Sequence, residues 1–253
     1  MFSIERQNEI VALLKIQKSV TVRELSKKFY VSEATIRRDL DKLDNKGIIK
    51  KTYGGAVLLE GLDIEIPLSV RETEQKNEKD IIGKLAADLV KNNDIIIMDS
   101  SSTTLKMVQY LKSKENLTVI TNGAKTAIEL GDLLHTQVYC TGGKLRENSL
   151  SYIGQFARKT ISNFYVDMAF FSCRSLSMEN GLYDSNPSEA ELRKDMMAKS
   201  KKSILLCDHT KFDSVSFCKI GELDNQIHAI ITDKSPSNRW VNFLDKRNIR
   251  LIY

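Results

Sequence analysis

The chain has 253 residues, of which 42% are hydrophobic, so it is long and apolar enough for one small and one medium domain. Its apolar runs fall short of the ~20 residues that cross a bilayer, and charges stand where a signal peptide is apolar, so we expect a cytoplasmic protein. The four cysteines and three histidines lack zinc-ligand spacing, and neither a metal nor a cofactor is expected.

The net charge of +5 is unevenly distributed along the chain. Residues 1–60 hold 12 Lys and Arg against 8 Asp and Glu, whereas the other 193 residues hold 26 basic and 25 acidic residues. The excess positive charge is therefore concentrated in the first quarter of the chain. This asymmetry indicates a polyanionic partner for the N-terminal part.

Three helical patterns follow one another near the N-terminus. Apolar residues on one face predict a first helix over residues 4–16. Thr21 and Glu24 match a capping box, which predicts that a second helix begins there. Ser32 is a suitable N-cap for a third helix, and Gly47 follows its expected end as a C-terminal glycine would.

Two short helices separated by about three residues form a helix-turn-helix, whose second helix reads the DNA major groove. Ile36, Leu40 and Leu43 lie on one face of the third helix and predict its buried side. Arginine reads guanine or holds phosphate, and serine and threonine bind phosphate, so the opposite side is suited to DNA. The outward positions are Ser32, Glu33, Thr35, Arg37, Arg38 and Lys42.

A basic strand, a glycine pair at Gly54-Gly55 and a second apolar strand predict a β-hairpin typical of a wing. We expect Lys50, Lys51 and Tyr53 to contact the DNA backbone or the minor groove. Taken alone, two adjacent arginines on a helix favour an ordinary solvated face over a DNA-binding one. The order of helix, capped helix, turn, capped basic helix and basic hairpin favours DNA binding.

The segment from Val31 to Leu40, VSEATIRRDL, with Gly47 and Gly54-Gly55-Ala56 after it, resembles the signature of the DeoR-type bacterial regulators. The resemblance implies a winged helix-turn-helix domain over residues 1–57 that binds double-stranded operator DNA. The sequence departs from the family at Lys51 and Tyr53, where Arg and His are more usual.

Residues 58–77 lose helical periodicity and are interpreted as an interdomain linker, with a helix beginning near Lys79. Arg71 and Lys79 match positions that are commonly basic in the DeoR-type family. Residues 78–253 then form the second domain.

Seven short, nearly continuous apolar runs in the second domain alternate with segments that suit helices. Such runs are typical of the buried strands of a parallel sheet, so we expect an α/β doubly wound fold. The expected strands are Ile95–Met98, Leu117–Ile120, Val138–Cys140, Met168–Phe171, Ile204–Cys207, Ala229–Ile231 and Ile249–Ile252.

Polar residues follow several of these strands, at the edge of the sheet where doubly wound folds bind ligands. Hydroxyls and free amides at helix starts bind phosphate, Arg146 and Lys211 add positive charge, and Asp99 and Asn122 suit sugar hydroxyls. Any one of these residues is equally well explained as a helix cap or turn. The candidate effector-binding residues are Asp99, Ser100, Ser101, Ser102, Thr103, Thr104, Thr121, Asn122, Gly142, Gly143, Arg146, Asp208 and Lys211.

The second domain also resembles the DeoR-type sensor domain, which is similar to the ribose-5-phosphate isomerase and CoA-transferase fold. The matching motif positions are Asp99–Thr104, Thr121-Asn122, Gly142-Gly143, Asp167–Phe170, Glu189–Glu191 and Asp208 with Lys211. The resemblance implies a phosphorylated sugar, or a related anionic metabolite, that releases a repressor from DNA. Two positions depart from the family pattern. Ser101 stands where glycine is usual, and Arg174 lies in a stretch that is more commonly glycine-rich.

The leading hypothesis is a sequence-specific regulator of sugar-metabolism genes that is not an enzyme. A dimer or tetramer is expected because one helix-turn-helix reads only a half-site. The alternative is a sugar-phosphate isomerase or transferase with a basic appendage, with Glu189, Glu191 or Asp208 as acid or base. A non-specific nucleic-acid binder is disfavoured by the small net charge and the lack of interleaved aromatic and basic residues.

Overall fold

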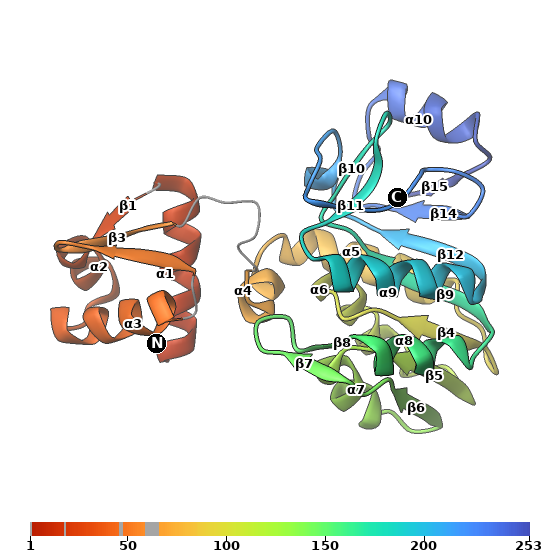
Figure 1. Cartoon of the computed structure of the whole chain (residues 1–253), viewed down its shortest axis with the longest axis horizontal. Coiled ribbons are helices and arrows are strands. Elements are labelled where there is room, and N and C mark those ends of the chain that lie inside the picture. The colour runs from red at the N-terminus through yellow and green to blue at the C-terminus, as the bar shows by residue number, and fades with distance from the viewer. Residues whose placement is uncertain (1, 18, 46–47, 59–65) are drawn as a thin grey trace. The chain divides into compact units, whose positions relative to one another are not determined.

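The computed structural model describes residues 2–17, 19–45, 48–58 and 66–253. The chain divides into two compact units, residues 1–73 and residues 74–253 (Figure 1). Across the described ranges, no helix is both long enough and apolar enough to cross a membrane.

The boundary between the units falls inside the predicted linker, but part of that segment is helical rather than irregular. Helix α4 (Leu68–Thr73) belongs to the first unit, where Ile66 and Val70 are buried in its core. The pattern over so short a helix spans less than two turns, so periodicity could not reveal it. Helix α5 (Lys76–Asp88) begins three residues before the expected start.

The first unit is a winged helix-turn-helix, as expected. Thr21 caps α2 with a complete capping box, since the Glu24 amide donates to its hydroxyl at 3.2 Å and its own amide donates to the Glu24 carboxylate at 2.9 Å. The predicted role of Gly47 falls outside the described residues. The elements are α1 (Ser3–Gln17), β1 (Ser19–Thr21), α2 (Val22–Phe29), α3 (Glu33–Asn45), β2 (Ile49–Thr52) and β3 (Gly55–Leu58).

Strand β1 was not predicted, because three residues are too few to show alternation. It pairs antiparallel with β3, and the sheet has the order β1-β3-β2 within the described residues. The close approach explains Gly55: a Cβ there would lie 2.2 Å from the Val20 carbonyl oxygen. Gly54 has a φ of +87°, which the tight turn of the hairpin requires.

A buried ion pair joins the first and third helices of this unit. Arg6 Nε lies 2.5 Å from Asp39 Oδ2, and the Ser3 hydroxyl donates to Asp39 Oδ1 at 2.8 Å. Both charged side chains are more than nine-tenths buried. Asp39 therefore fixes α1 against α3 from the side of α3 opposite its exposed basic face.

All seven strands predicted for the second unit are present and form one parallel sheet within residues 74–253. Their order is β15-β14-β12-β9-β4-β5-β6, so the chain starts at β4 in the middle of the sheet and winds first one way and then the other. This is the doubly wound topology. The strands are β4 (Ile95–Met98), β5 (Leu117–Thr121), β6 (Thr136–Cys140), β9 (Val166–Ser172), β12 (Ser200–Leu206), β14 (Ala229–Ile231) and β15 (Arg250–Ile252).

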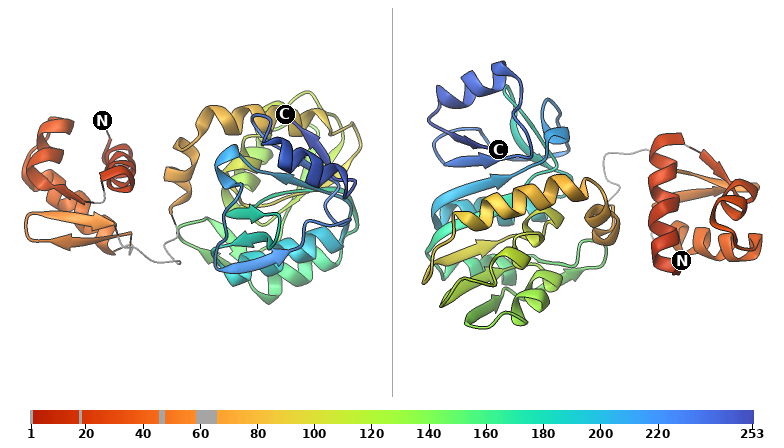
Figure 2. Two further views of the ribbon diagram at one scale, coloured as in Figure 1. Left: turned by 90° about the horizontal axis from the view of Figure 1, so that it is seen from above. Right: turned by 180° about the vertical axis from the view of Figure 1, so that it is seen from behind.

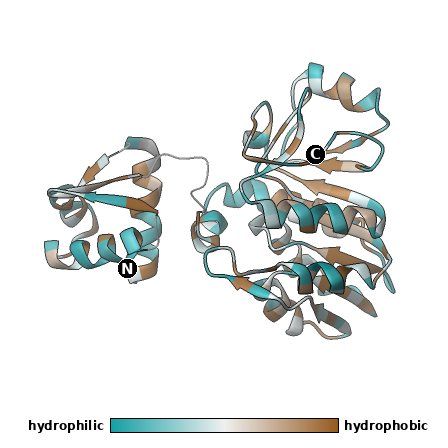
Figure 3. Cartoon of the chain, in the orientation of Figure 1, coloured by the Kyte–Doolittle hydropathy of each residue, from teal (hydrophilic) through white to brown (hydrophobic). Residues whose placement is uncertain are grey.

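Helices cover both faces of this sheet (Figure 2). Ile96 and Met98 of β4 point into a core shared with α5, whereas Ile97 points into a core shared with α8 (Gln155–Ser162) and α9 (Pro187–Ala198). The strands are accordingly apolar on both sides (Figure 3). Further helices are α6 (Ser102–Leu105), η1 (Val108–Tyr110), α7 (Ala124–Gly131), η2 (His209–Lys211) and α10 (Asn238–Asp245).

The segments between the parallel strands are not all helical, which corrects the simple alternation that we expected. A hairpin precedes α8, and a small antiparallel sheet of order β10-β11-β13 flanks α9 within residues 74–253. Each of these strands has only three or four residues, which hides their periodicity. They are β7 (Lys144–Arg146), β8 (Ser151–Ile153), β10 (Ser175–Ser177), β11 (Gly181–Asp184) and β13 (Cys218–Gly221).

The buried ion pair predicts a selective effect on the first unit. Asp39→Ala leaves Arg6 buried without its carboxylate and should destabilise this unit by about 3–5 kcal/mol. Asp41→Ala removes an exposed carboxylate two residues away and should cost about 1 kcal/mol or less. Hydrogen exchange of the α1 and α3 amides in the full chain measures both, and equal protection in the two variants would contradict the prediction.

Candidate nucleic-acid interface and effector site

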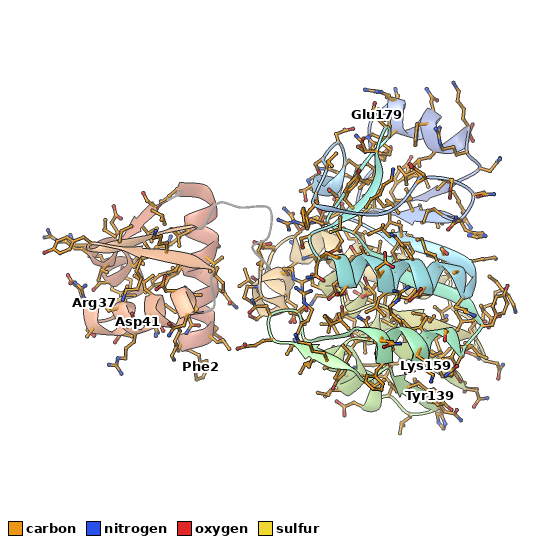
Figure 4. All side chains as sticks on the ribbon, in the orientation of Figure 1. Phe2, Arg37, Asp41, Tyr139, Lys159 and Glu179 are labelled. Atoms are coloured by element: carbon orange, nitrogen blue, oxygen red, sulfur yellow. The ribbon has the colours of Figure 1, made fainter. Side chains whose placement is uncertain are left out.

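The exposed face of α3 carries the residues that were predicted to meet DNA. Arg37, Arg38 and Lys42 are exposed, and Figure 4 shows Arg37 and Asp41 extending from this helix. Glu33 pairs with Arg37 at 3.5 Å across one helical turn. This long, exposed pair is weak, so the guanidinium remains available to a phosphate or a base.

Two of the predicted α3 residues have mainly local roles. The Ser32 hydroxyl accepts from the Thr35 amide at 3.2 Å, which is the expected N-cap. Thr35 is half-buried, and its hydroxyl lies 2.9 Å from that of Ser32. These two hydroxyl groups bond to each other, and that of Ser32 also caps the start of the helix.

The wing is attached to α3 by polar contacts. The Lys51 amide donates to Asp44 Oδ1 at 3.1 Å, and the Lys51 ammonium pairs with Asp41. Tyr53 is fully exposed at the hairpin turn, and Lys50 is exposed on the strand before it. These contacts join the hairpin to the helix, and both elements carry exposed basic residues.

The candidate effector residues gather where the winding of the large sheet reverses, between β4 and β9. Ligands of doubly wound sheets bind in the crevice that this reversal opens at the carboxyl ends of the strands. The loops are closely packed there: a Cβ on Gly123, after β5, would lie 3.1 Å from the Cα of Ser100, after β4. The topology thus brings together segments that are distant in sequence.

Asp99 is fully engaged by the protein itself. Its Oδ1 accepts from the Ser101 amide at 3.0 Å and from the Thr104 hydroxyl at 2.7 Å. Its Oδ2 accepts from the Ser172 amide and from Arg193 Nε, each at 3.0 Å. These four hydrogen bonds hold the loop after β4 against β9 and α9, and the expected bond from Asp99 to a sugar hydroxyl stays a prediction.

Sequence reasoning missed Arg193, which organises the whole site. Its buried guanidinium contacts Asp99 Oδ2 at 3.0 Å, Asp184 Oδ2 at 2.7 Å and Glu189 Oε2 at 3.8 Å. Burial alone would lower the pKa of Arg193, but the three carboxylates raise it, so the side chain stays charged. An arginine inside an amphipathic helix gives no signal in sequence that it turns inward.

The loop from Ser100 to Thr104 is buried and forms the start of α6. The Ser101 hydroxyl accepts from the Thr104 amide at 3.1 Å, and Ser101 has a φ of −73°. Glycine is therefore not required at this position, and the serine supplies a cap instead. The departure from the family pattern is explained by local structure.

Two buried oxygens at the strand ends have no hydrogen-bond partner among the described residues. They are Asn122 Oδ1 after β5 and Asp208 Oδ2 after β12, and each residue is about 1% exposed. Asn122 Nδ2 donates to the Tyr152 carbonyl at 3.2 Å, and Asp208 Oδ1 accepts from the Thr210 amide at 3.0 Å. An unpaired buried acceptor costs about 1–3 kcal/mol, which a ligand hydroxyl would recover.

Arg146, one of the two expected cationic residues, is held by a carboxylate. Arg146 Nη1 lies 3.1 Å from Glu189 Oε1, which also accepts from the Ser151 hydroxyl. Gly142 and Gly143, which precede this hairpin, have φ values of +64° and +111°. A Cβ at Gly143 would lie 2.7 Å from the Ile153 carbonyl oxygen, so glycine is needed there for close packing.

Lys211 lies in η2 close to the buried thiol of Cys173 and is half-buried. Thr121 is buried, and its hydroxyl accepts from the Gly123 amide at 3.0 Å. Arg174 is exposed, beyond the end of β9.

Comparison with known proteins identifies both units. The model of the DeoR-like helix-turn-helix domain matches residues 6–61, and that of the DeoR C terminal sensor domain matches residues 74–234.

Curated relatives match over nearly the whole chain. The HTH-type transcriptional regulator GolR of Listeria innocua is 42% identical over 92% of this chain and 91% of its own. The HTH-type transcriptional repressor GlcR of Bacillus subtilis is 32% identical over 100% of this chain and 96% of its own. The solved ribose 5-phosphate isomerase A of Neisseria gonorrhoeae has a TM-score of 0.42 and 15% identity over 56% of each chain.

The site predicts a sharp difference in thiol reactivity. Burial raises the pKa of Cys173 to about 12 despite nearby Lys211 and Arg193, and burial likewise raises that of Cys207, whereas Cys140 is exposed. At pH 8 the thiolate of Cys173 is about a thousandfold scarcer than with an ordinary pKa of 9. An aromatic disulfide reagent should therefore label Cys140 quickly and Cys173 and Cys207 only after unfolding, as followed by mass spectrometry; rapid labelling of Cys173 in the native protein would contradict this.

Proposed function

Because the chain belongs to the DeoR family of transcriptional regulators, we propose that it is a sequence-specific repressor of sugar-metabolism genes that a phosphorylated sugar releases from operator DNA. The exposed basic face of α3, joined to a basic wing, supports the reading of DNA. One observation supports the binding of a sugar phosphate. Two buried acceptor oxygens that lack partners among the described residues lie at the ends of β5 and β12, the strands on either side of β4 and β9.

The chemistry of the crevice suits a ligand with both hydroxyls and an anionic group. Asn122 Oδ1 and Asp208 Oδ2 accept hydrogen bonds, which sugar hydroxyls donate. Lys211 and the amides at the start of α6 favour an anion near the strand ends. Asp208 thus takes the sugar-binding role that the sequence suggested for Asp99, whose carboxylate is already saturated.

We propose binding without turnover. Glu189 is committed to Arg146 and Ser151, which leaves it poorly suited to exchange protons. The pKa of Glu191 is lowered, chiefly by its hydrogen bond to Lys194, so this half-buried carboxylate stays ionised at neutral pH. Neither behaves as the general acid that an isomerase needs.

Release from DNA follows from a shift between two conformations. The sugar phosphate binds more tightly to the conformation in which the DNA-binding units fit the operator poorly. A hundredfold loss of operator affinity requires a coupling free energy of about 2.7 kcal/mol, within the usual range for allosteric proteins. We propose a two-fold assembly, because each helix-turn-helix reads one half-site.

The recognition helix can be tested by removing its guanidinium groups one at a time. Arg37→Ala and Arg38→Ala should each weaken operator binding by about 1–3 kcal/mol, roughly 5- to 150-fold, without unfolding the protein. Fluorescence anisotropy on duplex DNA from upstream of the gene, against a scrambled duplex, measures the loss. Arg250→Ala removes the same charge from the second unit and should leave affinity unchanged. Full operator affinity in both α3 variants would refute the placement of the recognition helix.

The effector site can be tested separately through release of the operator. Asn122→Ala and Lys211→Ala should each raise the sugar phosphate concentration needed for release by roughly tenfold or more, because each removes a bond to a polar or charged ligand group. Operator affinity without ligand should stay unchanged. Lys219→Ala, which removes an exposed lysine paired with Glu222, serves as the control. Wild-type release by a panel of pentose and hexose phosphates in both site variants would place the site elsewhere.

A further inference from the structure

The buried residues of α3 define which of its side chains point away from the core. Ile36, Leu40 and Leu43 are buried. At about 100° per residue, Ala34 and Arg38 each lie about 200° around the helix from Ile36, one before it and one after it. Both are exposed. Ala34 and Arg38 therefore lie on the side of α3 directly opposite the core.

The residues next to Ala34 and Arg38 point elsewhere. Thr35 is half-buried, and its hydroxyl lies 2.9 Å from the Ser32 hydroxyl. Arg37 is only about 100° around the helix from Ile36, so it lies on a flank of the helix. The first turn of α3 thus presents the methyl group of Ala34 directly away from the core.

Asp41 follows on the same side of α3, three residues beyond Arg38. It is exposed, and its carboxylate pairs with the Lys51 ammonium on strand β2 of the wing. A carboxylate repels DNA phosphates, and Lys51 offsets that charge. The N-terminal residues of a recognition helix are the ones that contact base edges. Base reading therefore falls to Ala34 and Arg38, which precede Asp41.

The chemistry of these two side chains indicates which bases they can read. A methyl group forms no hydrogen bond, and its apolar counterpart in the major groove is the C5-methyl group of thymine. A guanidinium donates two hydrogen bonds to O6 and N7 of guanine. Because the side chain of Ala34 is short, the start of α3 can approach the floor of the groove, and the longer Arg38 reaches it from one turn further along.

We propose that Ala34 reads a thymine through its C5-methyl group and that Arg38 reads a guanine in the same half-site. The two residues are four positions apart, which is about 6 Å along the helix or about two base steps of DNA. This inference rests on the proposed function, because it names the bases that the DNA-binding unit selects. It adds Ala34 to the residues of α3 that the sequence led us to expect.

The probe is a duplex that the full chain itself selects from a random pool, so the operator need not be known in advance. Each thymine of the selected half-site is replaced in turn by deoxyuridine, which lacks only the C5-methyl group. At one thymine, this replacement should lower the affinity of the wild type about fourfold per half-site, because one buried methyl contact is lost. Fluorescence anisotropy measures the affinity for each duplex.

A double-mutant cycle assigns that contact to Ala34. Ala34→Gly removes the methyl group from the protein, so the deoxyuridine replacement should have no further effect in this variant. Any change in helix stability is the same for both duplexes and cancels in their ratio. Ala34→Ser keeps a helix-compatible side chain but makes it polar, and it should also abolish the effect. Thr35→Ala is the control on the next residue and should keep the fourfold loss.

A repeated selection tests the partner residue. Arg38→Ala should lose the preference for guanine and keep that for thymine. Guanine preference that survives in this variant would overturn the role of Arg38.

Failure of this inference is distinguishable from failure of the proposed function. A pool in which the wild type enriches no sequence would overturn both. An enriched half-site in which no deoxyuridine replacement lowers affinity would overturn the thymine contact alone and leave the repressor proposal standing. The same conclusion would follow if the effect persisted in both Ala34 variants, or if Thr35→Ala abolished it.

Discussion

The buried guanidinium of Arg193 is the interaction on which the sensing unit depends. It neutralises carboxylates from the end of β4, from β11 and from α9, and so ties the centre of the sheet to the layer that covers it. Removing one partner of such a buried cluster leaves an uncompensated charge that costs several kcal/mol. This cluster holds the loops at these strand ends in place through contacts within the protein.

The cluster also accounts for which polar side chains at this edge of the sheet already have partners. Asp99 and Glu189 face inward and are saturated by Arg193, Arg146 and neighbouring hydroxyls. Asn122 and Asp208 stand on the strands to either side, each with one oxygen left over. Polar residues at the same edge of the sheet thus differ in how many of their oxygen atoms have a partner, although all four residues are buried.

Much of this could be predicted from the sequence, and the reasons for success and failure are physical. The capping box at Thr21 is a local motif, so it was identified without tertiary information. The strands of the parallel sheet were predicted from short, nearly continuous apolar runs, which the central strands show because both of their faces are buried. Strand β1 and the small sheet around β11 were missed because strands of three or four residues show no periodicity. Arg193 was missed because its burial against Asp99, 94 residues away along the chain, leaves no mark on the local sequence pattern. The DNA-reading face stays a prediction, supported by the exposure of Arg37 and Arg38.

The winding order of the large sheet has a consequence for biosynthesis. Asp99 and Arg193 are 94 residues apart, and β4 can gain its second neighbour only after β9 has been made. At about 5–20 residues per second, the ribosome adds those residues in roughly 5–20 s. The DNA-binding unit has left the exit tunnel by then. The incomplete sheet still exposes β4, and Asp99 has not yet met Arg193. Newly made chains thus pass through an interval in which the first unit is complete and the second unit is still unfolded. During this interval the exposed apolar strand is a surface that chaperones can bind.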